Sequence, residues 1–135
     1  MTAGRRVVLD ASVFVRSVTE PGGQGAEWVA AVDRGAVEAH TAILVFTEVA
    51  NALVGYIRAG TLTLADAVGT LEALNILPLR LHGQEVAPAA LGAAVELGLS
   101  AYDGTYAALA ESYDAVLVTA DRRLAAAVRS AELVA

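Results

Sequence analysis

Short apolar runs alternate with longer stretches of helical periodicity along this chain. The two clearest runs are 7–9 (Val-Val-Leu) and 115–118 (Ala-Val-Leu-Val), and polar residues follow each of them at once. Continuous apolar runs of this length are typical of strands buried on both faces, as in the middle of a parallel sheet. Weaker strand patterns cover 36–40, 76–81 and 133–134. The alternation therefore predicts an α/β fold with a central, mostly parallel sheet.

Helical patterns fill the segments between the predicted strands. They cover residues 11–18, 25–34, 44–59, 63–74, 84–97 and 102–112, with a last helix beginning near residue 121. Thr63 and Asp66 form the N-terminal capping pattern of one helix, and Gly60 ends the helix before it. No repeat, linker or low-complexity segment interrupts this order, so we expect a single domain over residues 1–135.

The composition excludes some kinds of site and predicts a covered surface. The chain has no cysteine, which excludes disulfides and thiolate metal sites. Apolar residues make up 56% of the sequence, more than one core of a domain this size can bury. We therefore expect a homodimer, with the apolar faces of the helices within 44–57 and 62–74 as the covered surfaces.

Charge and hydropathy limit where the protein acts. The formal net charge of −6 argues against binding nucleic acid through a basic surface, although it allows a nucleic-acid enzyme whose acidic site holds cations. The longest apolar run, 42–57, is interrupted by Glu48 and Asn51 and is too short and too polar to span a bilayer. No long apolar segment follows the two N-terminal arginines, so we expect a cytoplasmic protein without a membrane segment.

Four carboxylates stand at positions that hydrophobic patterning alone does not explain. Asp10 and Asp121 each follow a predicted strand, Asp103 lies at the start of a predicted helix, and Glu48 lies inside an apolar helix. Taken singly, three of them have an ordinary alternative. Asp10 and Asp121 are suitable helix N-caps, and Asp103 suits a capping box begun by Ser100. Glu48 is harder to explain: because an unpaired buried carboxylate is costly, it is either a solvated residue on a narrow polar stripe or a member of a site.

Taken together, the carboxylates predict a metal site. Adjacent parallel strands end at one edge of a sheet, so Asp10 and Asp121 converge there if their strands are neighbours. Two carboxylates about 4 Å apart repel by roughly 4 kcal/mol at an effective dielectric constant of ~20, so a group of four needs a cation or must hold protons. Oxygen ligands without nearby histidine or cysteine favour Mg²⁺ or Mn²⁺. Asn51, on the same helix face as Glu48, is placed to orient it.

The chemistry predicted for such a site is metal-dependent hydrolysis of a nucleic-acid backbone, because a bound ion activates water and neutralises phosphodiester charge. Four segments carry a family resemblance that agrees with this prediction. They are Val8-Leu9-Asp10-Ala11-Ser12, Glu48-Val49-Ala50-Asn51-Ala52-Leu53, Tyr102-Asp103-Gly104-Thr105-Tyr106-Ala107-Ala108-Leu109-Ala110 and Val118-Thr119-Ala120-Asp121-Arg122-Arg123-Leu124. In this order they resemble the four motifs of PIN-domain nucleases, and in particular the VapC toxins of toxin–antitoxin pairs.

The resemblance implies a three-layer α/β/α fold, Mg²⁺- or Mn²⁺-dependent endoribonuclease activity on RNA, a homodimer, and inhibition by a small cognate antitoxin. It makes Asp10, Glu48, Asp103 and Asp121 the catalytic and metal-binding carboxylates. Ser12 and Thr119 match the family's hydroxyl positions, which orient carboxylates or metal-bound water. Gly104 departs from the family, where alanine is common, and we expect it to loosen the start of its helix.

Two other functions compete with this interpretation. Phosphotransfer on Asp10, as in haloacid-dehalogenase-like phosphatases or receiver domains, requires a lysine for the phosphoryl group, and this chain has none. A PIN-like domain that has lost activity and serves only as a binding scaffold is the second alternative, and the intact set of four carboxylates counts against it. We set His40 and His82 aside as packing or surface histidines. The roles of Arg16, Arg122 and Arg123 stay open.

Overall fold

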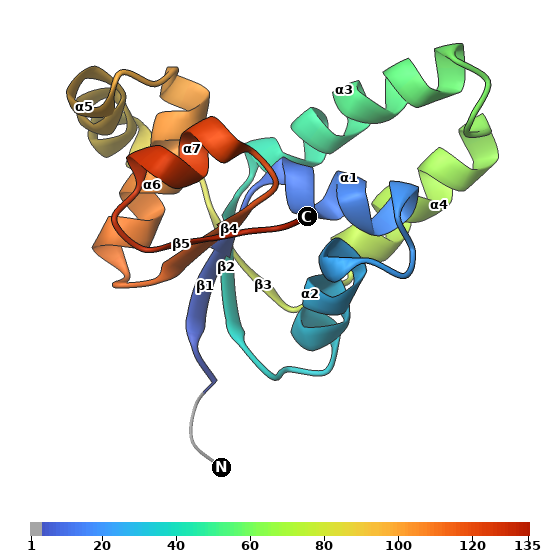
Figure 1. Cartoon of the computed structure of the whole chain (residues 1–135), viewed down its shortest axis with the longest axis horizontal. Coiled ribbons are helices and arrows are strands. Elements are labelled where there is room, and N and C mark those ends of the chain that lie inside the picture. The colour runs from blue at the N-terminus through green and yellow to red at the C-terminus, as the bar shows by residue number, and fades with distance from the viewer. Residues whose placement is uncertain (1–3) are drawn as a thin grey trace.

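The computed structural model describes residues 4–135 and contains one five-stranded sheet. The strands are β1 (Arg6–Leu9), β2 (Glu38–Ala42), β3 (Leu79–His82), β4 (Val116–Thr119) and β5 (Ala131–Leu133). They lie in the order β3-β2-β1-β4-β5, and every neighbouring pair is parallel. The predicted parallel sheet is therefore confirmed, with β1 and β4, the two clearest apolar runs, side by side at its centre (Figure 1).

Helices cover both faces of the sheet. The bounds are α1 (Ala11–Thr19), α2 (Gln24–Asp33), α3 (Leu44–Arg58), α4 (Leu64–Asn75), the 3₁₀ turn η1 (Gln84–Val86), α5 (Ala87–Leu97), α6 (Ala101–Ser112) and α7 (Arg122–Ala127). Helices α1 to α4 lie on one side of the sheet, and α5, α6 and α7 lie on the other (Figure 1). This arrangement confirms the three-layer α/β/α architecture.

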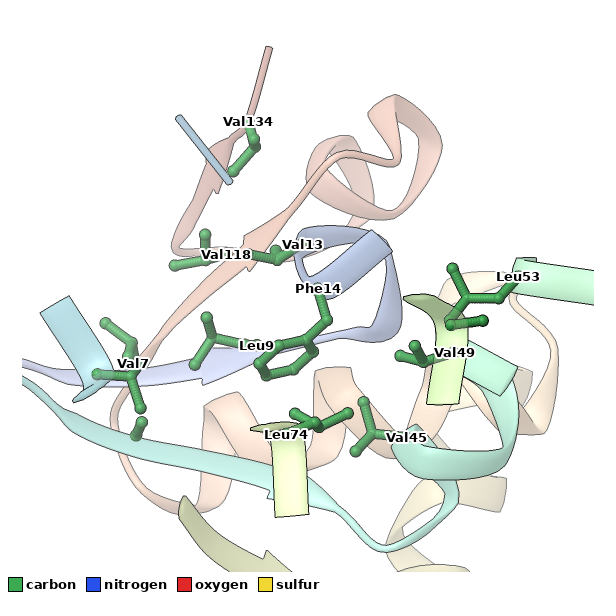
Figure 2. Close-up of a cluster of buried hydrophobic side chains, with 13 residues drawn as sticks. Val7, Leu9, Val13, Phe14, Val45, Val49, Leu53, Leu74, Val118 and Val134 are labelled. Carbon is green, nitrogen blue, oxygen red and sulfur yellow. The ribbon is translucent and has the colours of Figure 1, made fainter. Parts of the chain in front are cut away.

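Alternate residues of β1 supply the two halves of the core. Val7 and Leu9 pack with side chains of α1 and α3, including Phe14 and Val45, on one face (Figure 2). Val8 points to the other face and packs with side chains of α6, α7 and β4, including Tyr106. Because the strand is buried on both sides, its sequence is continuously apolar rather than alternating.

Both boundaries of the second strand differ from the predicted ones. Residues 36–40 were expected in the second strand, but β2 runs from Glu38 to Ala42 and includes His40 and Thr41. These two side chains are polar and yet buried, with 2% and 0% of their surface exposed, so a hydrophobic pattern cannot find them. Thr41 is satisfied by donating to the carbonyl oxygen of Leu9, and β2 is extended because it pairs with β3 through this segment.

Proline accounts for two further differences between the predicted and the observed elements. The third strand was expected over residues 76–81, but β3 begins only at Leu79, after Pro78, which has no N–H to donate to a ladder. The helix expected over residues 84–97 is divided into η1 and α5. Pro88 lies in the first turn of α5, the part of a helix where its missing N–H costs nothing. The last strand is Ala131–Leu133 rather than residues 133–134.

The expectation for Gly104 was wrong. A Cβ atom at this position would lie 2.4 Å from the carbonyl oxygen of Ala90 and 3.1 Å from the Cβ of Ala94, both on α5. Gly104 therefore does not loosen α6. It allows the backbones of α5 and α6 to approach closely, which is the usual reason for a small residue where two helices cross.

The α3–α4 pair extends away from the sheet (Figure 1). The inner face of α3, formed by Val45, Val49 and Leu53, is buried in the core, so this face needs no partner. Large apolar side chains on the outer surfaces of both helices stay exposed, namely Val54, Tyr56, Leu64 and Val68. Within residues 4–135, no helix is long and apolar enough to cross a membrane.

Candidate active site at the carboxyl ends of β1 and β4

The carboxyl ends of the two central strands bring Asp10 and Asp121 to one edge of the sheet. Asp10 follows β1 directly, and Asp121 is separated from the end of β4 by Ala120 alone. Leu9 is in register with Val118, so the two polar segments leave the sheet side by side. The prediction that the two strands are neighbours is confirmed, and the polar residues that follow them lie on one surface of the fold.

Asp10 is held by hydroxyl and backbone donors. Its side chain is N-cap of α1 and accepts a bond from the Ser12 N–H at 3.1 Å. The Ser12 hydroxyl donates to Oδ1 at 2.5 Å, and the Thr119 hydroxyl donates to Oδ2 at 2.5 Å. Burial nevertheless raises the pKa of Asp10 above its usual range, because the hydroxyl and N–H donors offset only part of the desolvation.

The two hydroxyls are aimed at Asp10 by the backbone of the β4–α7 loop. The Ala120 N–H donates to the Ser12 oxygen at 2.8 Å, and the Asp121 N–H donates to the Thr119 oxygen at 3.0 Å. A backbone N–H can only donate to each hydroxyl oxygen, so the hydroxyl's own O–H is free to donate to the Asp10 carboxylate, which is an acceptor. The sequence prediction gave Ser12 and Thr119 an orienting role, and the structure places both in direct contact with Asp10.

Asp121 is at once a helix cap and a member of this edge. Its Oδ1 accepts the N–H groups of Arg123 at 2.9 Å and Leu124 at 3.2 Å, which fixes the side chain at the start of α7. The capping interpretation and the site interpretation are thus compatible, because the cap holds one oxygen and leaves the other facing solvent. Asp103 lies in the first turn of α6, whose N-cap is Ser100; its backbone N–H, not its carboxylate, donates to the Ser100 hydroxyl oxygen at 3.1 Å.

Glu48 has a partner that the sequence did not reveal. It lies on α3, and the hydroxyl of Tyr106 on α6 donates to its Oε1 in a short hydrogen bond. Tyr106 is 1% exposed, and from the sequence it was named only within a family motif, without a role of its own. The sequence offered one sign of this contact, a tyrosine among alanines in a predicted helix. A buried tyrosine hydroxyl usually has a hydrogen-bond partner.

The pKa values of Glu48 and Asp103 are also raised, which is unusual for carboxylates on a protein surface. Burial raises the pKa of Glu48, and the charges of Asp10 and Asp103 raise it further against the Tyr106 hydrogen bond, which lowers it. Burial also raises the pKa of Asp103, with a further contribution from Asp121 and an opposing one from Arg123. No ion pair in the described part of the chain joins an arginine to any of these carboxylates.

A groove of about 410 Å³ opens beside this edge. Ser12, Glu48, Asn51 and Asp121 line it, together with Arg16, the one basic side chain among its lining residues. Arg16 is paired with Glu20 at 2.9 Å. Asn51 faces the same groove as Glu48, as expected for residues three apart on a helix. The groove lies between α1, α3 and the β4–α7 loop, and apolar side chains such as Val15 and Ala52 line it beside the polar ones.

The site provides oxygen donors for a divalent cation but not a finished cage. Among residues 4–135, no group of three or more acidic or histidine side chains is arranged to hold a metal ion as it stands. Mg²⁺ is usually bound by one or two carboxylates and several waters, so a complete protein cage is not required. The buried Asp10, the free oxygens of Glu48 and Asp121, and the absence of arginine partners fit such an ion.

His40 and His82 lie elsewhere, as expected. His40 Nδ1 lies 2.9 Å from His82 Nε2, and its other nitrogen lies 2.8 Å from Glu38. The His40 ring stacks on Tyr113 with centroids 4.4 Å apart. Of the three arginines left open, Arg16 lines the groove, Arg123 donates to the carbonyl of Gly98, and Arg122 is exposed.

Asp10, Glu48, Asp103 and Asp121 together form what we call the acidic edge of the sheet. The parallel α/β fold with this acidic edge is that of a PIN-like domain, and comparison with known proteins agrees. The profile of the PIN domain matches residues 7–129. The chain is 40% identical over 93 residues to ribonuclease VapC3 of Pyrobaculum aerophilum, which covers 67% of this chain and 71% of that protein. This chain belongs to the PIN domain family.

Solved structures share the fold. PAE2754 of Pyrobaculum aerophilum superposes with a TM-score of 0.74 and 29% identity over 96% of this chain and 90% of that one. A toxin–antitoxin complex from Klebsiella pneumoniae matches with a TM-score of 0.61 over 93% of this chain and 95% of that one, at 13% identity. The second likeness concerns the fold alone.

Proposed function

We propose that this protein is a VapC-type endoribonuclease, the toxin of a toxin–antitoxin pair, and that it cleaves RNA with Mg²⁺ or Mn²⁺. The observation that carries the proposal is the set of carboxylates at the ends of β1 and β4 without an arginine partner, with the pKa of Asp10 raised by burial. The similarity to ribonuclease VapC3 supports the substrate class. An RNA substrate is consistent with action in the cytoplasm.

In this proposal Asp10 and Asp103 would hold the ion directly, and Glu48 and Asp121 would contribute partly through water. When bound, the ion supplies an activated water and neutralises charge on the scissile phosphodiester. Ser12 and Thr119 keep Asp10 in one orientation, since both donate to it. Asn51 lines the groove beside Glu48, where it can contact the RNA backbone.

The proposal is tested by incubating the purified protein with single-stranded and stem-loop RNA. We expect cleavage with Mg²⁺ or Mn²⁺ and none after chelation with EDTA, restored by adding the ion back. Cleavage that persists in excess EDTA would contradict the metal requirement. No cleavage of any RNA under these conditions, with intact fold, would favour the alternative of a scaffold without activity.

The proposed partners are a second copy of the chain and an antitoxin. The exposed Val54, Tyr56, Leu64 and Val68 make α3 and α4 the proposed dimer surface, which should bury at least ~1,000 Å² in total. An antitoxin tail carrying arginine or lysine would lie along the acidic groove and neutralise it. Sedimentation showing a monomer at tens of micromolar would contradict the dimer. Failure to co-purify with the product of an adjacent upstream gene would contradict the toxin assignment.

A further inference from the structure

Tyr106 joins the two helical layers at the acidic edge of the sheet. Its ring belongs to the core between the sheet and the layer of α6 and α7. Glu48 lies on α3, whose buried residues belong to the core on the other face. The two residues are 58 positions apart in the sequence, and the hydrogen bond between them connects the opposite layers. A merely local packing role would not require this connection.

Glu48 needs such a restraint because nothing else in the described structure holds its carboxylate. The Tyr106 hydroxyl is the one hydrogen-bond donor to this side chain within residues 4–135, and no arginine is paired with it. Asp10 and Asp103 are close enough for their charges to act on Glu48. A glutamate side chain also has several rotatable bonds to immobilise. Without the phenol, repulsion would turn the carboxylate away from the other acids.

The bond uses only one of the two carboxylate oxygens. Tyr106 donates to Oε1, while Oε2 has no partner in the described part of the chain, and Glu48 lines the groove beside Asp121. The phenol is thus placed as the outer hydrogen-bond partner of a carboxylate that faces the groove. Partners of this kind typically change metal affinity or activity by ~10–100-fold when they are removed.

We propose that Tyr106 is a positioning residue that holds Glu48 at the acidic edge so that its free oxygen serves the divalent ion. This inference rests on the proposed function, because it assumes an ion at this edge. It assigns to the buried phenol a task beyond packing. It also predicts that the two residues act as one unit, so that the effect of removing either should depend on the presence of the other.

The test is a double-mutant cycle with Mn²⁺ binding measured by calorimetry. Tyr106→Phe keeps the ring and removes only the hydroxyl, and we expect it to weaken Mn²⁺ binding by ~10-fold. Glu48→Gln should weaken binding at least as much, and adding Tyr106→Phe to Glu48→Gln should change the affinity no further. Tyr102→Phe is the matched control, because Tyr102 lies on the same helix and is 67% exposed. It should bind Mn²⁺ like the wild type.

A second measurement separates positioning from packing. RNA cleavage by Tyr106→Phe should recover toward the wild-type rate at high Mn²⁺, because excess ion compensates for lower affinity. Unchanged Mn²⁺ affinity in Tyr106→Phe, or losses that add in the double variant, would overturn the inference while leaving the proposed nuclease function intact. Absence of Mn²⁺ binding by the wild-type protein would overturn both.

Discussion

Two groups of polar side chains belong to this sheet, one around Glu38 and one around Asp10. The negative charge of the carboxylate is compensated by basic side chains in the first group and, among the residues that the structure describes, by no basic side chain in the second. Glu38, at the start of β2, lies 3.2 Å from the guanidinium of Arg6, 3.4 Å from that of Arg80 and 2.8 Å from His40. The His40 hydrogen bond and the arginine charges hold the pKa of Glu38 below its usual range. Asp10, at the end of β1, has only hydroxyl and N–H donors, and burial raises its pKa.

We interpret this difference in pKa as that between a structural carboxylate, Glu38, and one proposed to act in the site, Asp10. Glu38 is neutralised by side chains of its own chain and needs nothing more. Asp10 is buried with hydrogen bonds but without a countercharge, and the neighbouring acids increase the negative charge around it. A fold that keeps such a group uncompensated loses stability, which is a common property of sites that bind a ligand. We propose that a cation from outside the chain balances Asp10, the alternative being that its carboxyl holds a proton.

We expect the largest effect from Asp10→Asn, which tests whether the Asp10 carboxylate acts in the site. The variant keeps the shape of the side chain and removes its charge, so RNA cleavage should fall by more than ~100-fold. Asp114→Asn is the matched control, because Asp114 is exposed and lies before β4, at the opposite end of the strand. Cleavage assays at saturating Mn²⁺ measure both. Equal rates for Asp10→Asn and the wild type would remove Asp10 from the site.

The hydroxyl donors should matter less than the carboxylate itself. Thr119→Val removes the bond to Asp10 Oδ2 and should lower Mn²⁺ affinity or cleavage by ~10–100-fold. Thr41→Val is the control, since it removes an equally buried hydroxyl whose bond goes to the Leu9 carbonyl instead. Calorimetry and cleavage rates should distinguish them. Equal losses in both variants would mean that destabilisation, and not the orientation of Asp10, is the cause.

Supplying an internal cation should make the acidic edge resemble the Glu38 group. Asn51 lines the groove beside Glu48 and is exposed, so Asn51→Arg can place a guanidinium there without disturbing the core. We expect the ion-free protein to gain thermal stability and the Mn²⁺ affinity to fall by about three- to tenfold, the size of a partly exposed ion pair. Asn51→Gln should change neither quantity. Unchanged Mn²⁺ affinity in the arginine variant would argue against an ion at this edge.

The smallest expected effects concern stability against pH. Glu38 has a lowered pKa in the fold, so its contribution is present above its ordinary value of 4.5 and is lost as the pH falls further. Asp103 has a raised pKa, so it costs stability as the pH rises above its ordinary value of 3.8. At pH 7.5 without metal, Glu38→Gln should therefore lower the melting temperature, and Asp103→Asn should raise it slightly. Both differences should shrink toward pH 4, and the same sign for both variants at pH 7.5 would contradict the comparison.

Much of the acidic edge could be predicted from the sequence because each acid stands beside a strong local pattern. Asp10 and Asp121 follow the two clearest apolar runs, and neighbouring parallel strands necessarily end at the same edge. Tyr106 could not be predicted in the same way. Its partner, Glu48, is 58 residues away on another helix, and a contact across the two layers leaves no periodic signal.

The parts of the fold that the sequence did not predict depend on partners rather than on periodicity. His40 and Thr41 are polar, but they lie in β2 because neighbouring strands and side chains satisfy them. Gly104 was misread because only the packing of α6 on α5 shows that a side chain would collide with Ala90. In each case the deciding contact is distant in the sequence.

We propose that the carboxylates at the ends of β1 and β4 are left without a countercharge so that a divalent cation can bind there. Titration of the ion-free wild-type protein with Mn²⁺, followed by calorimetry and by melting temperature, tests this claim most directly. We predict saturable binding with an increase in melting temperature at pH 7.5, and loss of both effects in Asp10→Asn while Glu38→Gln retains them. Binding that is absent in the wild type, or equal in Asp10→Asn, would contradict the claim.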